Sequence, residues 1–354
     1  MSALFRPLRL RSLEIPNRCW VSPMCQYSAD DGIVGAWHRM HLGVFATGGA
    51  GLIMAEATGV VPEGRISIAC PGLWNDAQVE AWRDVVDFVH AQGALIGVQL
   101  SHAGRKGSTM APWADHLIAS PAEGGWVTVA PSAIAFGTYP TPRALSLAEL
   151  DELVAAFAAA AGRARVAGFD VIELHAAHGY LLHQFLSPLS NQRDDAYGGD
   201  LAGRARLLLR VVDAVRETIG PDVPLLVRVS ATDWTEGGLD LEQVEQIGLW
   251  LGHHGVDLID VSSGGNVADA HIPVGPGYQV PFAEGVRRAS GVPTSAVGMI
   301  TEPDQAEEIV ASGRADAVML ARAFLRNPRW ALGAAEALGE RITWPSQLER
   351  ARAL

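Results

Sequence analysis

Short apolar runs alternate along the chain with longer amphipathic ones. Eight of the short runs are rich in Val, Ile and Leu and are bounded by Gly, Pro or Asp, as buried strands are. They span residues 18–24, 51–60, 94–101, 169–177, 223–230, 256–264, 293–299 and 315–322. Between them, apolar residues recur every three or four positions, as on one helix face. This alternation predicts a single α/β domain over residues 1–354, a (β/α)₈ TIM barrel.

Helix boundaries support the same reading of the chain. Ser146 and Glu149 form a predicted capping box at the start of one helix. Thr301 and Asp304 are expected to cap a later helix in the same way, and Gly313 to end it. A doubly wound sheet is the alternative fold. It normally carries a GxGxxG turn after an early strand, and the sequence has none.

One segment interrupts the alternation. Residues 103–143 are rich in Gly, Pro and Trp and are too long for a plain connection between a strand and a helix. Long loops of this kind often cover active sites. We therefore predict an inserted lid after the third strand, and we expect Trp113 and Trp126 to shape one wall of the site.

Composition narrows the class of protein. The 354 residues are 49% hydrophobic and carry a formal net charge of −12 without a long acidic block. This balance disfavours a nucleic-acid partner or an anionic membrane and favours small-molecule substrates. The cysteines are Cys19, Cys25 and Cys70, with no CxxC pair, which predicts a reducing, cytoplasmic location. Neither a signal peptide nor a membrane-spanning stretch is recognisable.

Three predicted strands place polar residues where a barrel interior is expected. Side chains alternate between the inside and the outside of a barrel strand. With the aliphatic residues directed outward, Gln99, His175 and Arg228 point inward, each near the carboxyl end of its strand. Burying such groups without a partner costs several kcal/mol each, on the order of the desolvation penalty. They therefore require a polar ligand or one another.

Other interpretations of these residues remain open. His175 and His178 could be packed core histidines or could bind a metal, although arginines at neighbouring strand ends disfavour a cation. Arg228 could pair with Glu173, and Gln99 could be a satisfied core amide. A second HxxH pair, His38 and His41, falls on a predicted first helix with no strand end nearby, where packing or subunit contacts are expected.

The last two predicted strands suggest an anion site. TIM barrels commonly bind a phosphate group beside their seventh and eighth strands, using backbone N–H groups and a nearby charge. Gly298 would let the backbone approach the phosphate, and Arg322 would supply the positive charge.

Together these residues resemble a known family. The stretch HAAHGYLLHQFLSPLSNQRDDAYGG (175–199) is similar to the signature of the old yellow enzymes, FMN-dependent ene-reductases. SPMCQYSADDG (22–32) resembles the bacterial subgroup called thermophilic-like. MAEATGV (54–60), GVQLSHAGRK (97–106), LLVRVSATDW (225–234) and SAVGMI (295–300) match in the same order, so the resemblance covers essentially the whole chain.

The resemblance implies a noncovalent FMN at the carboxyl ends of the strands. Carried over by position, the residues that bind the flavin would be Ser22, Pro23, Met24, Cys25, Ala57, Gln99, Arg228, Gly298, Ala321 and Arg322. Cys25 would lie near the reactive edge of the flavin, although it could also be a buried structural cysteine. Arg228 would face the pyrimidine end. The family usually has Gly-Arg where this chain has Ala321-Arg322, but a backbone N–H donor survives that change.

The implied activity is that of an NADPH dehydrogenase with ene-reductase chemistry. NADPH, or alternatively NADH, would reduce the flavin, and hydride would then pass from flavin N5 to an activated alkene such as an enone or a nitroalkene. His175 and His178 would bind the substrate oxygen, Tyr180 would donate a proton, and Tyr27 would border the substrate. These four residues are thus the predicted substrate-binding set.

The resemblance also implies a homo-oligomer, a dimer or a tetramer. Arg350 would match an arginine that reaches into a neighbouring subunit's site, but Leu348 replaces a tyrosine common in that tail. Three other functions remain as alternatives. They are a metal-dependent barrel hydrolase that uses His175 and His178, a flavin-binding redox sensor without turnover, and a dienoyl-CoA reductase, which three scattered cysteines disfavour.

Overall fold

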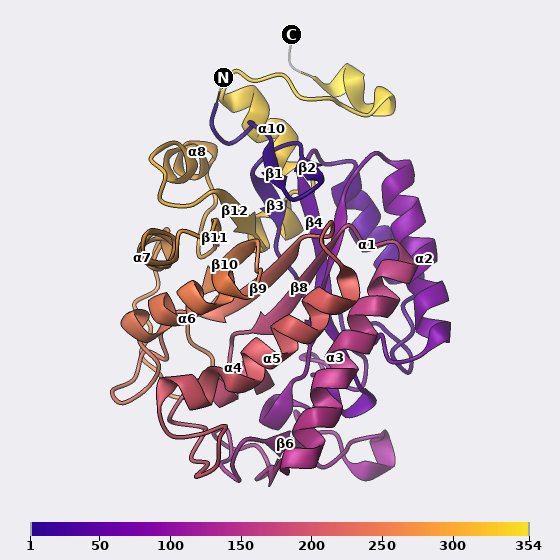
Figure 1. The fold of residues 1–354 in the computed structure, drawn as a ribbon. Coiled ribbons are helices and arrows are strands. Elements are labelled where there is room, and N and C mark those ends of the chain that lie inside the picture. The colour runs from indigo at the N-terminus through magenta and orange to yellow at the C-terminus, as the bar shows by residue number, and fades with distance from the viewer. Residues whose placement is uncertain (1, 353–354) are drawn as a thin grey trace.

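The computed structural model describes residues 2–352 and shows a closed barrel of eight parallel strands (Figure 1). The strands follow one another around the barrel in chain order. They are β3 (Cys19–Val21), β4 (Leu52–Gly59), β5 (Ile96–Ser101), β8 (Val171–Ala176), β9 (Leu225–Ser230), β10 (Leu258–Ser262), β11 (Thr294–Ala296) and β12 (Ala317–Leu320). Each predicted apolar run contains one of them, so the predicted barrel is confirmed.

Helices cover the outside of the barrel (Figure 1). They are α1 (Ala36–Ala46), α2 (Asp76–Ala91), α3 (Leu147–Ala167), α4 (Leu181–Leu186), α5 (Leu201–Ile219), α6 (Leu241–His253), α7 (Val280–Ser290), α8 (Pro303–Ala311), α9 (Arg322–Arg326) and α10 (Trp330–Ala337). The outward strand residues, such as Ile172 and Val227, are fully buried in the core between strands and helices. The assumption that the aliphatic residues face outward is therefore correct.

Of the two predicted helix caps, one is confirmed and the other is wrong. Ser146 and Glu149 form the capping box of α3, as predicted. The cap predicted from Thr301 and Asp304 is wrong, because α8 begins at Pro303 without a side-chain cap. A proline at the first helical position has no N–H, which leaves one donor fewer to satisfy. Gly313 does follow the end of α8, with a φ of 75°.

A hairpin packs against the amino-terminal end of the barrel. Strands β1 (Leu8–Leu10) and β2 (Leu13–Ile15) pair in antiparallel fashion. Leu10 and Ile15 pack against the first inward residues of the barrel strands, including Trp20. In Figure 1 the 3₁₀ helix η4 (Ser346–Ala351), drawn in yellow, lies toward the same end of the molecule as this hairpin.

The segment after β5 is long and mostly irregular. It contains the 3₁₀ turns η2 (Gly104–Lys106) and η3 (Pro121–Glu123) and two short parallel strands, β6 (Val129–Ala130) and β7 (Arg143–Ala144). In Figure 1, β6 lies at the end of the molecule away from the chain termini. The structure thus shows the insertion, whereas its action as a lid stays a prediction.

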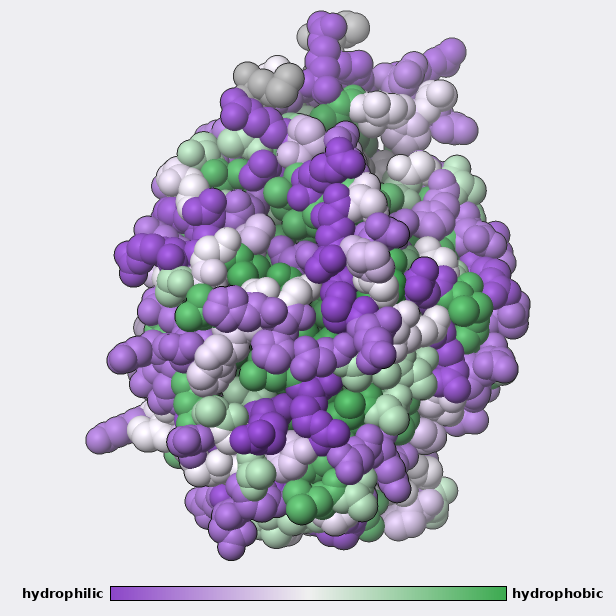
Figure 2. Space-filling model, in the orientation of Figure 1, coloured by the Kyte–Doolittle hydropathy of each residue, from purple (hydrophilic) through white to green (hydrophobic). Residues whose placement is uncertain are grey.

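The surface shown in Figure 2 intersperses hydrophilic with hydrophobic residues. Within residues 2–352, no helix combines the length and the apolar character that crossing a bilayer requires.

Candidate active site

A cavity of about 530 Å³ lies at the carboxyl ends of the barrel strands. Its volume is in the range typical of small-molecule sites. All the predicted site residues except Met24 and Tyr27 line it. These are Ser22, Pro23, Cys25, Ala57, Gln99, His175, His178, Tyr180, Arg228, Gly298, Ala321 and Arg322. Residues that are far apart in the sequence thus converge on one cavity.

Met24 and Tyr27 lie beside the cavity. Met24 is partly buried against the core between the barrel and its helices, and it borders a small space that His38 and His41 also line. Tyr27 packs in the cluster that holds Cys25 and Tyr180, and its ring meets Trp113 edge-on at 5.7 Å between centroids. The structure therefore places Tyr27 next to the predicted substrate residues, whereas Met24 borders the space beside α1 and is not among the residues that line the cavity.

His175, His178 and Tyr180 are brought together by a tight turn after β8. His178 and Gly179 have φ values of 58° and 73°, in the left-handed region. The backbone N–H of His178 donates to Ser230 Oγ at 2.9 Å, which holds this strained residue in place. The ring of His175 then lies 5.1 Å from that of His178 and 4.8 Å from that of Tyr180, between centroids.

Burial decides the protonation of these three side chains. It lowers the pKa of His175 and of His178 well below 6.5, and the nearby positive charge of Arg228 adds to the effect. Burial also raises the pKa of Tyr180 well above 10. At neutral pH the site therefore holds two neutral imidazoles and one protonated phenol, and each of them has a proton to donate.

Hydrogen bonds to the two imidazoles determine which nitrogen carries the proton. The N–H of Ala177 donates to His175 Nδ1 at 3.3 Å, so the proton of this neutral ring is on Nε2. His178 Nε2 lies 2.7 Å from Ser262 Oγ. The Ser262 hydroxyl can also donate to Gln279 Oε1 at 3.3 Å; when it donates to His178 over the shorter distance, the proton of His178 is on Nδ1. Each ring then keeps one N–H for a ligand.

A buried polar network lies among the inward residues. Arg228 Nε is 2.8 Å from Asp260 Oδ2, although its N–H is not directed at that oxygen. Asp260 Oδ1 accepts from Ser295 Oγ at 2.8 Å, and Glu173 Oε1 accepts from Gln99 Nε2 at 2.7 Å. The alternative that paired Arg228 with Glu173 is therefore wrong, because the ion pair is made with Asp260.

Two buried carboxyl groups of this network, those of Glu173 and Asp260, lie near a single positive charge, that of Arg228. Burial, together with the nearby Asp260, raises the pKa of Glu173 to about 8. Burial raises the pKa of Asp260 as well, but the adjacent Arg228 and the hydrogen bond from Ser295 favour its ionised form, so Asp260 serves as the counter-ion and Glu173 keeps its proton at neutral pH. Sequence reasoning missed Asp260, although it has the same inward parity on β10 that revealed Arg228 on β9.

The predicted phosphate end lies after β11 and β12. Gly298 has a φ of 112°, and a Cβ there would come within 2.7 Å of Gln279 Nε2. Ala321 precedes α9 with a φ of −105°, a conformation that does not require glycine. The change from the family's glycine therefore preserves the backbone at this point. Arg322 lines the same end of the cavity.

These groups fit a flavin mononucleotide. An anionic phosphate suits the end with Gly298 and Arg322, and a polar ring system suits the end with Gln99 and Arg228. Arg228 lines the cavity as well as pairing with Asp260, so its guanidinium can meet a group bound there.

Lys106 is a further polar residue beside the site. Its Nζ donates to the carbonyl oxygens of His178 and Gly265 at 2.9 and 2.8 Å, and it lies 5.3 Å from the centre of the Tyr180 ring. Burial lowers the pKa of Lys106 to about 8. It follows the end of β5, where strand alternation no longer predicts side-chain direction, so the sequence pattern could not reveal it.

The inserted segment does not line the cavity as expected. Among the described residues that line it, none comes from 103–143. The ring of Trp126 instead lies 5.1 Å from the guanidinium of Arg65, and Trp113 reaches only Tyr27. The prediction that these two tryptophans form a wall of the cavity is therefore wrong for this conformation.

In the HxxH pair of α1, His41 has the expected packing role, whereas His38 contacts a carboxylate. The ring of His41 packs against Phe45 at 4.8 Å, and burial lowers its pKa to about 4. His38 Nε2 lies 3.3 Å from Glu56 Oε1. Glu56 is the bulged residue of β4, where the register with β5 shifts, so a strand does lie nearby.

Comparisons with known proteins agree with this geometry. The model of the NADH:flavin oxidoreductase / NADH oxidase family matches residues 3–340. An NADPH dehydrogenase of Geobacillus thermodenitrificans (strain NG80-2) is 48% identical over 352 residues, which are 99% of this chain and 98% of that protein. One of Listeria innocua serovar 6a (strain ATCC BAA-680 / CLIP 11262) is 48% identical over 354 residues, 99% of each chain.

Solved structures show the same barrel. Morphinone reductase matches with a TM-score of 0.81 at 31% identity, covering 98% of this chain and 92% of that one. A 2-naphthoyl-CoA reductase matches with a TM-score of 0.86 at 25% identity, covering 96% of this chain and 52% of that one. The barrel, the cavity and the similarity to these relatives together define the class of the protein, a flavin-dependent oxidoreductase. The chain belongs to the NADH:flavin oxidoreductase / NADH oxidase family, which is that of the old yellow enzymes.

Proposed function

We propose that this enzyme uses noncovalently bound FMN to reduce the activated C=C bonds of α,β-unsaturated carbonyl compounds, and of nitroalkenes, at the expense of NADPH or NADH. The observation that carries the proposal is the cluster of two neutral imidazoles and one protonated phenol inside a cavity that two arginines also line. When bound, FMN supplies the hydride chemistry, in two half-reactions of a ping-pong cycle. The reductant is proposed from the names of the relatives.

The protein holds the cofactor from both ends. Arg228 would compensate negative charge on the pyrimidine end of the ring, and Gln99 would hydrogen-bond to it. Gly298, Ala321 and Arg322 would hold the phosphate. Cys25 lines the cavity and would contact the flavin near its reactive edge.

His175 and His178 would bind the substrate oxygen. Negative charge develops on this oxygen as the alkene accepts hydride, and two N–H donors aimed at it stabilise the transition state. Neutral imidazoles keep this role across the physiological pH range because the pKa values of both rings lie well below 6.5.

Tyr180 would donate the proton that completes the reduction. Its raised pKa keeps the phenol protonated at neutral and mildly alkaline pH. Its ring packs against His175 at 4.8 Å, so Tyr180 lies beside the residues that would bind the substrate oxygen, and its phenol would protonate the α-carbon of the substrate. General acids of this kind contribute about 10²–10⁴-fold in rate.

Tyr180→Phe tests this role in a stopped-flow experiment on the FMN-loaded enzyme. Oxidation of the reduced enzyme by 2-cyclohexenone should slow by about 10²-fold or more, because the general acid is lost. Reduction of the enzyme by NADPH should change little. Tyr197→Phe is the matched control, since Tyr197 is buried outside the cavity and bonds to Arg210. Equal slowing of both half-reactions would refute the assignment.

The class of activity has a simpler test. The purified protein should be yellow, lose its colour with NADPH and regain it with an enone. A colourless protein with stoichiometric zinc would instead favour a metal-dependent hydrolase. A flavin that NADPH reduces but no enone, nitroalkene or maleimide reoxidises would favour a redox sensor.

We also propose a homo-oligomer and a cytoplasmic location. Arg350 lies exposed on the turn η4, and in such an assembly it would reach a neighbouring chain's cavity. Sedimentation of the holoenzyme would measure the assembly. All three cysteines are free, as a reducing compartment requires.

A further inference from the structure

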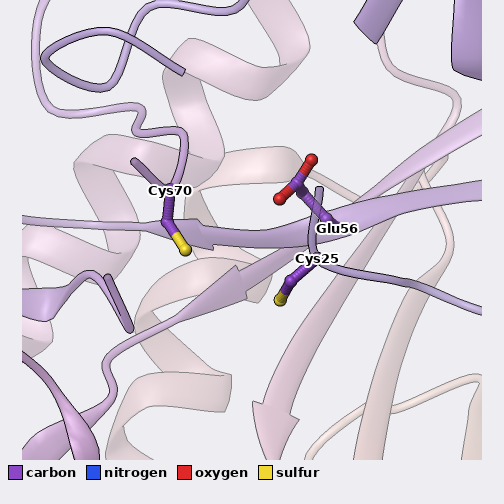
Figure 3. A group of neighbouring side chains, drawn as sticks. All are labelled: Cys25, Glu56 and Cys70. Atoms are coloured by element: carbon purple, nitrogen blue, oxygen red, sulfur yellow. The ribbon is translucent and has the colours of Figure 1, made fainter. Parts of the chain in front are cut away.

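Cys25, Glu56 and Cys70 surround a common space beside the cavity (Figure 3). Cys25 follows β3, Glu56 is at the bulge of β4, and Cys70 lies in the loop between η1 (Pro62–Gly64) and α2. Their two sulfur atoms and one carboxylate oxygen all lie within 4.8 Å of one another. We propose that these three side chains bind a thiophilic divalent cation, such as Zn²⁺ or Cd²⁺.

The triangle of ligand atoms has a suitable size. With sides of 4.8 Å, the point equidistant from the three atoms would be about 2.8 Å from each, whereas bonds from zinc are about 2.3 Å to sulfur and 2.0–2.2 Å to oxygen. At this upper limit of separation each sulfur would move by roughly 0.5 Å and the oxygen by roughly 0.6–0.8 Å, which small side-chain rotations supply. Among residues 2–352, this is the one group of three metal-ligating side chains at such distances.

The three segments that carry the ligands are already tied together. The N–H of Gln26 donates to Glu56 Oε2 at 2.8 Å, and the N–H of Ala29 donates to the carbonyl of Ala69 at 2.9 Å. Each of these bonds lies within a few residues of a ligand. The binding site is therefore preformed by the fold, and an ion would not have to order a loose loop.

Neighbouring groups orient the individual ligands. The N–H of Ser67 donates to Cys70 Sγ at 3.4 Å, and His38 Nε2 contacts Glu56 Oε1 at 3.3 Å. Groups of this kind, hydrogen-bonded to metal ligands, raise affinity by fixing the direction of the ligand atoms. His38 thereby acquires a role, since it would orient the carboxylate of the ligand Glu56.

The chemistry of the three groups selects the type of ion. Two sulfur ligands prefer Zn²⁺ and Cd²⁺ to hard cations such as Mg²⁺. Binding would displace the thiol protons to solvent, and the ion's positive charge would compensate the thiolates.

Occupation of the site would affect catalysis. Cys25 lines the main cavity, and it packs in the same cluster as Tyr180. An ion bound to Cys25 would bring positive charge next to the proposed proton donor and would withdraw the thiol from the flavin. The ion is therefore an inhibitor of the proposed reaction, and the site itself does not depend on what that reaction is.

Titration of the purified holoprotein with CdCl₂ tests the site. Thiolate-to-cadmium charge-transfer absorption should grow to one ion per chain. Cys70→Ser should weaken Cd²⁺ binding by about 100-fold or more, since even outer groups of a metal site contribute 10–100-fold. Cys19→Ser is the matched control, because Cys19 is a fully buried thiol of β3 outside the triangle. Unchanged cadmium affinity in Cys70→Ser would overturn the proposal, as would equal loss in Cys19→Ser.

Two further measurements keep the result unambiguous. Glu56→Gln removes the anionic oxygen without removing a thiol, so it provides a second variant if Cys70→Ser does not fold. It should also weaken binding. Cd²⁺ should inhibit NADPH oxidation by the wild-type holoenzyme, whereas Cys70→Ser should retain basal activity and lose the inhibition. Inhibition that persists in Cys70→Ser would place the inhibitory ion elsewhere and overturn the proposal.

Discussion

The two ends of the barrel interior differ in chemistry although they come from the same strands. Near the amino-terminal ends, the inward residues are apolar and include Val171, Leu226 and Leu258. Two positions further along the same three strands, the inward residues are Glu173, Arg228 and Asp260. A single step of two residues thus leads from a packed layer to the layer that carries the site.

The difference shows what each layer requires. The apolar layer needs only close contact, and the hairpin residues Leu10 and Ile15 pack against it at the amino-terminal end. Each polar group of the other layer requires a partner, since an unpaired buried donor or acceptor costs about 1–3 kcal/mol. Part of this requirement is met internally, by Arg228 with Asp260 and by Gln99 with Glu173. Gln99 and Arg228 also line the cavity, where they can meet a ligand.

The largest expected effect comes from breaking the polar layer. Arg228→Leu would leave Asp260 buried without its counter-ion, which typically costs about 3–5 kcal/mol. We expect the free energy of unfolding in urea to fall by that amount and FMN to be lost on gel filtration. A variant that keeps both its stability and its flavin would show that the ion pair is dispensable.

Breaking the apolar layer should reduce stability alone. Leu258→Ala removes a fully buried side chain and should lower the free energy of unfolding by about 3 kcal/mol. Flavin content and rates of both half-reactions should remain close to wild type at temperatures where the variant is folded. A loss of activity under those conditions would contradict the separation of the two layers.

Acid should destabilise the protein through the histidines at the carboxyl ends of the strands. Burial lowers the pKa of His102 from 6.5 to about 4, so the unfolded chain binds this proton first. Stability is therefore complete above pH 6.5 and falls as the pH drops toward 4, on the order of 2–3 kcal/mol for this residue.

Urea unfolding across that pH range provides the measurement. His102→Asn should flatten the dependence of the unfolding free energy on pH between about 6.5 and 4. The control is His271→Asn, because His271 is exposed on the surface. An unchanged slope in His102→Asn would show that other groups cause the acid sensitivity.

The smallest effect is expected from the hydroxyl that holds His178. Ser262→Ala removes the 2.7 Å contact to His178 Nε2, which is worth about 1 kcal/mol, or roughly fivefold in ligand affinity. A phenol titrated into the FMN-loaded protein would report the change through the flavin spectrum. Ser263→Ala is the control, since Ser263 bonds to Gln279 and Trp234 instead. Equal weakening by both variants would argue against the His178 contact.

The alternation of inward and outward side chains along the strands predicted one part of the polar layer, and another part was missed. Gln99, His175 and Arg228 stood out because each interrupts an aliphatic strand. Asp260 obeys the same alternation within residues 256–264, so the same reasoning applied to that strand would have revealed it. Lys106 and Tyr27 lie beyond the strands, where backbone turns set the side-chain direction and local pattern has no predictive value.

The sequence by itself determined the eight strands, the outward direction of their aliphatic residues and the convergence of His175, Arg228 and Gln99 on one interior. These properties follow from local periodicity, which every segment carries independently. Tertiary structure alone decided that Arg228 pairs with Asp260 rather than with Glu173, because this depends on the register of β9 against β10. It also decided that Cys25, Glu56 and Cys70 meet, because a bulge redirects one side chain and barrel closure brings three separate segments together.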